Sequence, residues 1–137
     1  MEKEGKAQIM VFGVFDGIHE GHRSFLNEAM NKGRVIIVVT HDSIVRALKN
    51  KTPKQPLSVR MEQLYQEFSD AKVIAGDELL NSWQVVLDEK PDIILLGYDQ
   101  QNMKKTLDLF IVSNNLSTKI EQAEPFQPDK YHTSLFK

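Results

Sequence analysis

The residues best suited to chemistry are two histidines, His19 and His22, in a short glycine-bounded segment near the N-terminus. Gly17 and Gly21 let the backbone turn tightly and approach a ligand closely. The segment follows an apolar run and opens a helical pattern, so the free N–H groups and positive dipole end of a helix lie beside the histidines. Because residues three apart share one side of a helical turn, both imidazoles are expected to reach one phosphate group.

Apolar runs typical of strands alternate with helical patterns along the chain. Helices are expected around Phe25 to Met30, Ile44 to Leu48 (with Asp42 as cap), Met61 to Phe68, Leu79 to Leu87 and Met103 to Ile111. The expected strands are Ile9–Phe15, Val35–Val39, Lys72–Ala75, Ile93–Leu96 and Ser117–Ala123. This alternation predicts an α/β fold, a doubly wound parallel five-stranded sheet with helices on both faces, in one domain spanning 1–137. Ligands of such sheets bind beyond the carboxyl ends of the strands.

Composition narrows the class of protein. The 137 residues suit one compact domain, and the hydrophobic share of 41% and charged share of 26% are ordinary for a soluble protein. A net charge of -2 gives no general attraction to nucleic acid or an anionic membrane. There are no cysteines, which excludes disulfides and thiolate metal sites. With no signal-peptide pattern at Met1 to Lys6, a cytoplasmic enzyme or binding protein is expected.

The segment from Gly13 to His22, Gly-Val-Phe-Asp-Gly-Ile-His-Glu-Gly-His, resembles the signature of the cytidylyltransferase-like nucleotidyltransferases, in which His-x-Gly-His follows the first strand. The resemblance implies a Rossmann-like fold, binding of ATP or CTP, and a Mg²⁺ requirement. It also implies that both histidines stabilise charge on the α-phosphate as pyrophosphate leaves. The nucleotide-binding residues that it implies here are Gly13, Val14, Phe15, Asp16, Gly21 and His22.

The stretch Leu48-Lys49-Asn50-Lys51 resembles the basic loop of that family. The resemblance implies a catalytic role for Lys49 and a contact between Lys51 and a phosphate of the triphosphate or acceptor. Arg60 resembles an arginine at the start of the following helix and is expected to bind the acceptor or a phosphate; pairing with Glu62 or another acid is the alternative.

Two later stretches also resemble family motifs. In Leu96-Gly97-Tyr98-Asp99-Gln100, which follows the fourth expected strand, Gly97 and Asp99 are expected to contact the nucleotide. The final residues resemble the family's closing Ser/Thr-rich phosphate motif, with nucleotide-binding roles for Thr133 and Ser134 and a phosphate contact for Lys137. A lysine stands there where an arginine is common, and a lysine cannot make the bidentate contact of an arginine.

Metal chemistry leaves one alternative open. Asp16 is expected either to help hold Mg²⁺ or to orient a histidine. Ligation of a metal by His19 and His22 themselves is disfavoured, because no third ligand is evident.

The most favoured reaction is transfer of AMP from ATP to FMN, as in small archaeal-type FAD synthases, which the loop from Leu96 to Gln100 resembles most. The Leu48 to Lys51 stretch instead resembles glycerol-3-phosphate cytidylyltransferases, so transfer from CTP to a polyol or sugar phosphate is the alternative. A nucleotide-binding module without turnover is the alternative of another class. The expected partners are a nucleoside triphosphate and a phosphorylated small-molecule acceptor, with neither nucleic acid nor membrane, and a homodimer is plausible.

Overall fold

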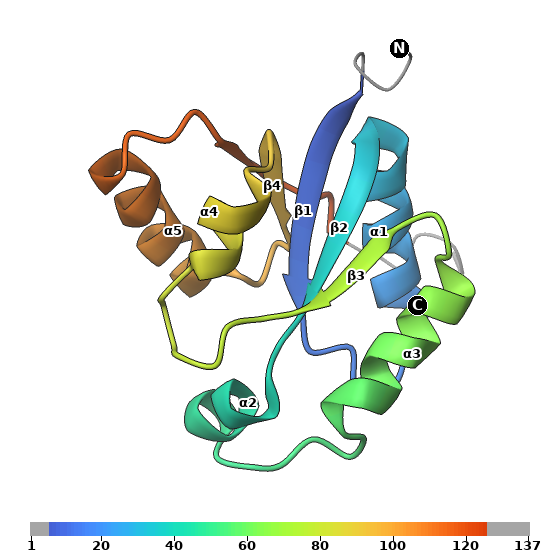
Figure 1. Cartoon of the computed structure of the whole chain (residues 1–137). Coiled ribbons are helices and arrows are strands. Elements are labelled where there is room, and N and C mark those ends of the chain that lie inside the picture. The colour runs from blue at the N-terminus through green and yellow to red at the C-terminus, as the bar shows by residue number, and fades with distance from the viewer. Residues whose placement is uncertain (1–5, 126–137) are drawn as a thin grey trace, which may run out of the picture.

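The computed structural model describes residues 6–125, which form an α/β unit around one sheet. All paired strands of the sheet are parallel, and their order is β3-β2-β1-β4-β5 (Figure 1). The prediction of a doubly wound, parallel five-stranded sheet is confirmed. The strands are β1 Ala7–Gly13, β2 Gly33–Val39, β3 Lys72–Ala75, β4 Ile93–Leu96 and β5 Lys119–Gln122.

Helices cover both faces of this sheet (Figure 1). Alternate residues of β1 point to opposite faces, so Ile9 and Val11 pack with the apolar sides of α1 and α3, whereas Met10 and Phe12 pack with those of α4 and α5. Both faces of β1 and β2 are therefore buried, which explains their continuous apolar runs. The helices are α1 Glu20–Lys32, α2 Asp42–Lys49, α3 Leu57–Glu67, α4 Gln84–Glu89 and α5 Gln101–Ser113.

The helix predicted around Leu79 to Leu87 is correct only in its second half. Asn81 and Trp83 have positive φ angles of 62° and 51°, which a right-handed helix cannot accommodate, so α4 begins at Gln84. Leu79 lies before the helix and is 74% exposed. A second difference concerns α2, where the N-cap is His41 rather than Asp42, because the His41 ring accepts the Ser43 N–H.

The strand order reverses between β1 and β4. The chain runs outward from β1 through β2 to β3 and then crosses back to β4, which pairs with β1 on its other side. In open α/β sheets this switch point is where the loops at the carboxyl ends separate and leave room for a ligand. α2 lies beyond the carboxyl ends of β1, β2 and β3 (Figure 1). Among residues 6–125, no helix combines the length and apolarity needed to cross a bilayer.

Candidate active site

The loop between β1 and α1 has a tightly specified shape. Phe15 adopts a positive φ of 53°, which is rare for a bulky residue, and its buried ring folds back over Gly13. A Cβ at Gly13 would lie 2.6 Å from that ring, so only glycine fits there. Gly17 has a φ of 95°, a conformation that glycine adopts without strain. Phe15 also lies edge-on to His22, with the ring centroids 5.1 Å apart.

His19 and His22 cap the start of α1 reciprocally. Nδ1 of His19 accepts the N–H groups of Gly21 and His22 at 3.1 and 3.3 Å, and Nδ1 of His22 accepts the N–H of His19 at 3.2 Å. A neutral imidazole carries its proton on one nitrogen only, so a ring that accepts through Nδ1 has its N–H at Nε2. The capping bonds therefore leave the Nε2–H of each ring as its donor.

The charge state of His22 supports this assignment. Burial lowers the pKa of His22 to about 4, and the neighbouring His19 acts in the same direction. At neutral pH His22 is therefore an uncharged imidazole, which keeps its Nδ1 lone pair for the His19 N–H. A neutral Nε2–H donor at the positive end of the α1 dipole suits an anionic ligand such as a phosphate.

The loop between β4 and α5 faces this histidine pair. Gln100 links it to β1, since its side chain accepts the Gly97 N–H at 2.7 Å and donates to the Phe12 carbonyl at 3.1 Å. The Asp99 carboxylate is close enough to act on the pKa of His22, which it raises slightly against the larger effect of burial. The structure thus brings Gly97 and Asp99 to the same edge of the sheet as His19 and His22.

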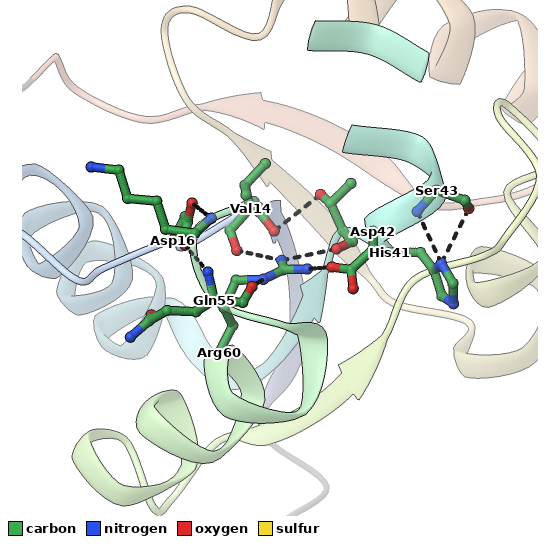
Figure 2. A network of polar contacts seen from close by, with 10 residues as sticks. Val14, Asp16, His41, Asp42, Ser43, Gln55 and Arg60 are labelled. Atoms are coloured by element: carbon green, nitrogen blue, oxygen red, sulfur yellow. Dashed lines mark hydrogen bonds and ion pairs between the residues drawn. The ribbon is translucent and has the colours of Figure 1, made fainter. Parts of the chain in front are cut away.

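Arg60 has a structural role. Its side chain is fully buried in the first turn of α3. The guanidinium donates to the carbonyls of Val14, Thr40 and Gln55 at 2.8 to 3.0 Å, and it forms an ion pair with Asp42 (Figure 2). Four of its five N–H groups are occupied and the side chain has no exposed surface, so the guanidinium cannot reach a bound acceptor or phosphate. It joins the ends of β1 and β2 to α2 and to the basic loop, which comprises residues 50–56 between α2 and α3, instead of binding the acceptor or a phosphate as the resemblance implied.

The Asp16 side chain binds the backbone of the basic loop. The carboxylate accepts the N–H groups of Lys54 and Gln55 at 2.7 and 3.0 Å, and the Lys54 bond is the main cause that lowers the pKa of Asp16 (Figure 2). The acid therefore positions a loop, a role that neither sequence alternative named. Lys49 ends α2 and Lys51 follows in the loop, both with exposed side chains, so each is available to a ligand.

The remaining expected residues, Thr133, Ser134 and Lys137, lie outside the described residues. Within the described range 6–125, there is no cluster of three or more histidine or acidic side chains that would hold a metal without help from a substrate.

Sequence reasoning missed several residues that shape the site. Asp42, read as a helix cap, is the ion-pair partner of Arg60. Gln100 was part of a recognised loop, yet its side-chain bonds to Gly97 and to Phe12 of β1 had no sequence signal. Thr40, whose N–H and hydroxyl both donate to the Gly13 carbonyl, was identifiable only as the residue that follows a buried strand.

These features define a class: an α/β protein with a histidine-capped helix start at the switch point of a parallel sheet. Comparison with known proteins gives the family. The cytidylyltransferase-like family model matches residues 10–135, so the chain belongs to the cytidylyltransferase-like family.

Curated relatives of the chain are archaeal FAD synthases. The FAD synthase of Thermococcus sibiricus is 31% identical over 121 residues, which cover 88% of this chain and 82% of that protein. The FAD synthase of Archaeoglobus profundus is 30% identical over 128 residues, covering 93% of this chain and 81% of that protein.

Solved structures agree on the fold. The lipopolysaccharide core biosynthesis protein from Thermoplasma volcanium is 31% identical and superposes with a TM-score of 0.81, covering 90% of this chain and all 100% of that one. The pantoate-beta-alanine ligase from Francisella tularensis is 14% identical, has a TM-score of 0.65, and covers 97% of this chain and 67% of that one. The second likeness concerns the fold alone.

Proposed function

We propose that this protein is an FMN adenylyltransferase, which transfers AMP from ATP to the phosphate of FMN and releases pyrophosphate. The observation that carries the proposal is the histidine pair: two stacked imidazoles, each with its donor at Nε2, at the start of α1 beside the switch point. The similarity to archaeal FAD synthases over most of the chain supports FMN as the acceptor.

The chemistry needs no nucleophile from the protein. A phosphate oxygen of FMN attacks the α-phosphorus of ATP, and the bond from that phosphorus to the oxygen of pyrophosphate breaks. Protein groups contribute by positioning and by stabilising the charge that develops on the phosphoryl oxygens. In this proposal the Nε2–H groups of His19 and His22 donate to the α-phosphate, and Lys49 and Lys51 neutralise other phosphates. The roles implied for Gly13, Val14, Phe15 and Gly21 are to bring the backbone close to the nucleotide.

Mg²⁺ fits this site as part of its ATP complex. Magnesium is commonly held by substrate phosphates with one or two carboxylates, and the described residues offer no larger acidic cluster. Both oxygens of Asp16 already accept backbone N–H groups, so Asp99, exposed at the facing loop, is the freer carboxylate. When bound, the ion would neutralise charge on the leaving pyrophosphate.

The test is pyrophosphate release in the presence of Mg²⁺, with ATP and CTP each combined with FMN, glycerol-3-phosphate and sugar phosphates. We expect release and FAD formation with ATP and FMN only. Binding of ATP without release from any pair would show a nucleotide-binding module and refute the proposal.

A second candidate is transfer to a sugar or polyol phosphate. It is favoured by the similarity to the lipopolysaccharide core biosynthesis protein, whose name points to carbohydrate chemistry. Release with CTP and glycerol-3-phosphate, or with a sugar phosphate, would establish it in place of FAD synthesis.

We also propose that the enzyme acts in the cytoplasm as a homodimer, without nucleic acid or membrane as a partner. Tyr65 of α3 is a large hydrophobic side chain that is 56% exposed, and it supports a contact between subunits. Sedimentation equilibrium measures the oligomeric state directly, and a monomer at micromolar concentration would contradict the dimer.

A further inference from the structure

A cavity of about 250 Å³ lies at the carboxyl ends of β1 and β2. Its floor is made by Phe12 and Val38, which pair across β1 and β2 near the carboxyl ends of these strands. Residues from α2, from the segment 76–83 and from α5 form the walls, and apolar side chains dominate, among them Leu48, Leu80 and Met103. Thr40 also lines the cavity and donates to the Gly13 carbonyl, so the cavity adjoins the start of the loop that leads to the histidines.

One wall of this cavity carries an unusual tryptophan. Trp83 lies edge-on to Phe12, with ring centroids 5.4 Å apart, and its backbone has a φ of 51°. Its indole Nε1 is buried, and among the described residues it has no hydrogen-bond partner. A strained backbone and an unpaired buried donor are both unfavourable. Strained backbones cluster at ligand sites, and an unpaired buried donor needs an explanation.

We infer that this cavity binds the planar tricyclic ring of FMN. We also infer that the indole of Trp83 turns on binding, so that its covered Nε1–H donates to a carbonyl oxygen at the edge of that ring. The inference rests on the proposed function and assigns the acceptor's ring to named residues. A cavity of ~150 Å³ accommodates one benzene ring, so the space here admits a larger fused ring. A glycerol or sugar hydroxyl would lie against apolar walls with few partners, whereas a flavin offers an apolar face and carbonyl acceptors.

The position of the cavity determines where the ribityl chain and the phosphate of FMN would lie. A ring held over Phe12 and Val38 leaves the ribityl chain and its phosphate free to extend toward Gly13 and the start of α1. The phosphate then reaches the side of the sheet where the histidines and the basic loop lie. Ring recognition and phosphoryl transfer thus use separate residues, which makes them separable by mutation.

Three variants test the inference. Trp83→Phe keeps an aromatic ring and removes the N–H. Thr106→Phe fills the cavity from α5, and Val112→Phe adds the same ring to an exposed position of that helix outside the cavity. The measurements are steady-state kinetics with ATP and FMN, and calorimetric titration with FMN, riboflavin and glycerol-3-phosphate.

In Trp83→Phe we expect the KM for FMN to rise about 3- to 10-fold, the effect of losing one neutral hydrogen bond, with kcat and the KM for ATP unchanged. In Thr106→Phe we expect affinity for FMN and riboflavin to fall more than about 10-fold, whereas Val112→Phe should match the wild type. Riboflavin, which lacks the phosphate, should still bind the wild type.

The outcomes separate this inference from the proposed function. If FAD is formed and neither Trp83→Phe nor Thr106→Phe changes affinity for FMN, the cavity assignment is overturned and the adenylyltransferase stands. If the wild type forms no FAD, the proposed function fails, and riboflavin then decides about the cavity. The cavity assignment is upheld if riboflavin binds the wild type and Val112→Phe but not Thr106→Phe. It is overturned if riboflavin does not bind the wild type.

Discussion

The imidazole rings of His19 and His22 lie stacked, with their centroids 3.7 Å apart and their planes 17° apart. Each ring accepts a backbone N–H through Nδ1, so each side chain both caps α1 and keeps a donor at Nε2. A substitution to alanine would remove both roles at once. Variants that keep the cap and remove the donor are therefore needed to isolate the chemistry.

His19→Asn is such a variant. Asparagine is a strong N-cap whose side-chain oxygen accepts the same backbone N–H groups, but it lacks a donor at the reach of Nε2. We expect the free energy of unfolding to stay within about 0.5 kcal/mol of the wild type, and kcat to fall by about 10²- to 10³-fold, as when one charge-stabilising donor is lost. Urea unfolding and pyrophosphate release measure the two. Unchanged release in a folded His19→Asn protein would show that the imidazole is not part of the reaction.

The lowered pKa of His22 predicts a pH-dependent stability. The unfolded state takes up a proton near the ordinary pKa of 6.5, whereas folded His22 resists it down to about 4, so acidification favours unfolding. Between pH 7 and 5 we expect the free energy of unfolding of the wild type to fall by about 1 kcal/mol more than that of His22→Gln. This value is smaller than the full pKa difference would give, because solvent screens the partly exposed ring. Glutamine at this position retains the reciprocal cap. Asp16 also has a lowered pKa, but its effect begins below about 3.8. If urea unfolding gave the same pH dependence of the unfolding free energy for the wild type and His22→Gln, the lowered pKa of His22 would be contradicted.

Arg60→Met should destabilise the fold. It leaves the Asp42 carboxylate and the carbonyls of Val14, Thr40 and Gln55 without their buried donor. Removal of one partner of a buried ion pair costs about 3–5 kcal/mol, which denaturant unfolding would detect. The control is Asp42→Asn with Arg60→Met, in which the unpaired charge is gone and part of the loss should be recovered. A stable Arg60→Met protein with a raised KM for ATP would instead restore the phosphate-binding role.

Asp16→Ala should release the basic loop, because the N–H groups of Lys54 and Gln55 lose their acceptor. Trypsin should then cleave at Lys51 or Lys54 several times faster than in the wild type, as judged by mass spectrometry of the fragments. Cleavage at an unrelated exposed lysine, such as Lys105, serves as the internal control. An unchanged cleavage rate together with a higher Mg²⁺ requirement would favour the metal-binding alternative.

Much of the fold was predictable, because short-range patterns carry it. Val35 to Val39 read as a strand buried on both faces, and all five residues are buried. The glycine-bounded histidines were assigned to the start of a helix, and they cap α1. The helix predicted around Leu79 to Leu87, which begins only at Gln84, shows where short-range patterns fail. Apolar spacing there fits a helix, but the left-handed backbone at Asn81 and Trp83 places those leucines at the cavity instead.

The sequence by itself determined the alternation of strands and helices, and the loop in which His19 and His22 meet the start of α1. Only the tertiary structure decided which groups Arg60 and Asp16 bind and that Trp83 packs on Phe12, since these partners are distant in sequence. Arg60 reaches Val14 across 46 positions, and Asp16 reaches Gln55 across 39. A side chain's type and spacing limit the bonds it can make. Which partner it finds, and whether water is excluded around it, depends on packing that no local pattern encodes.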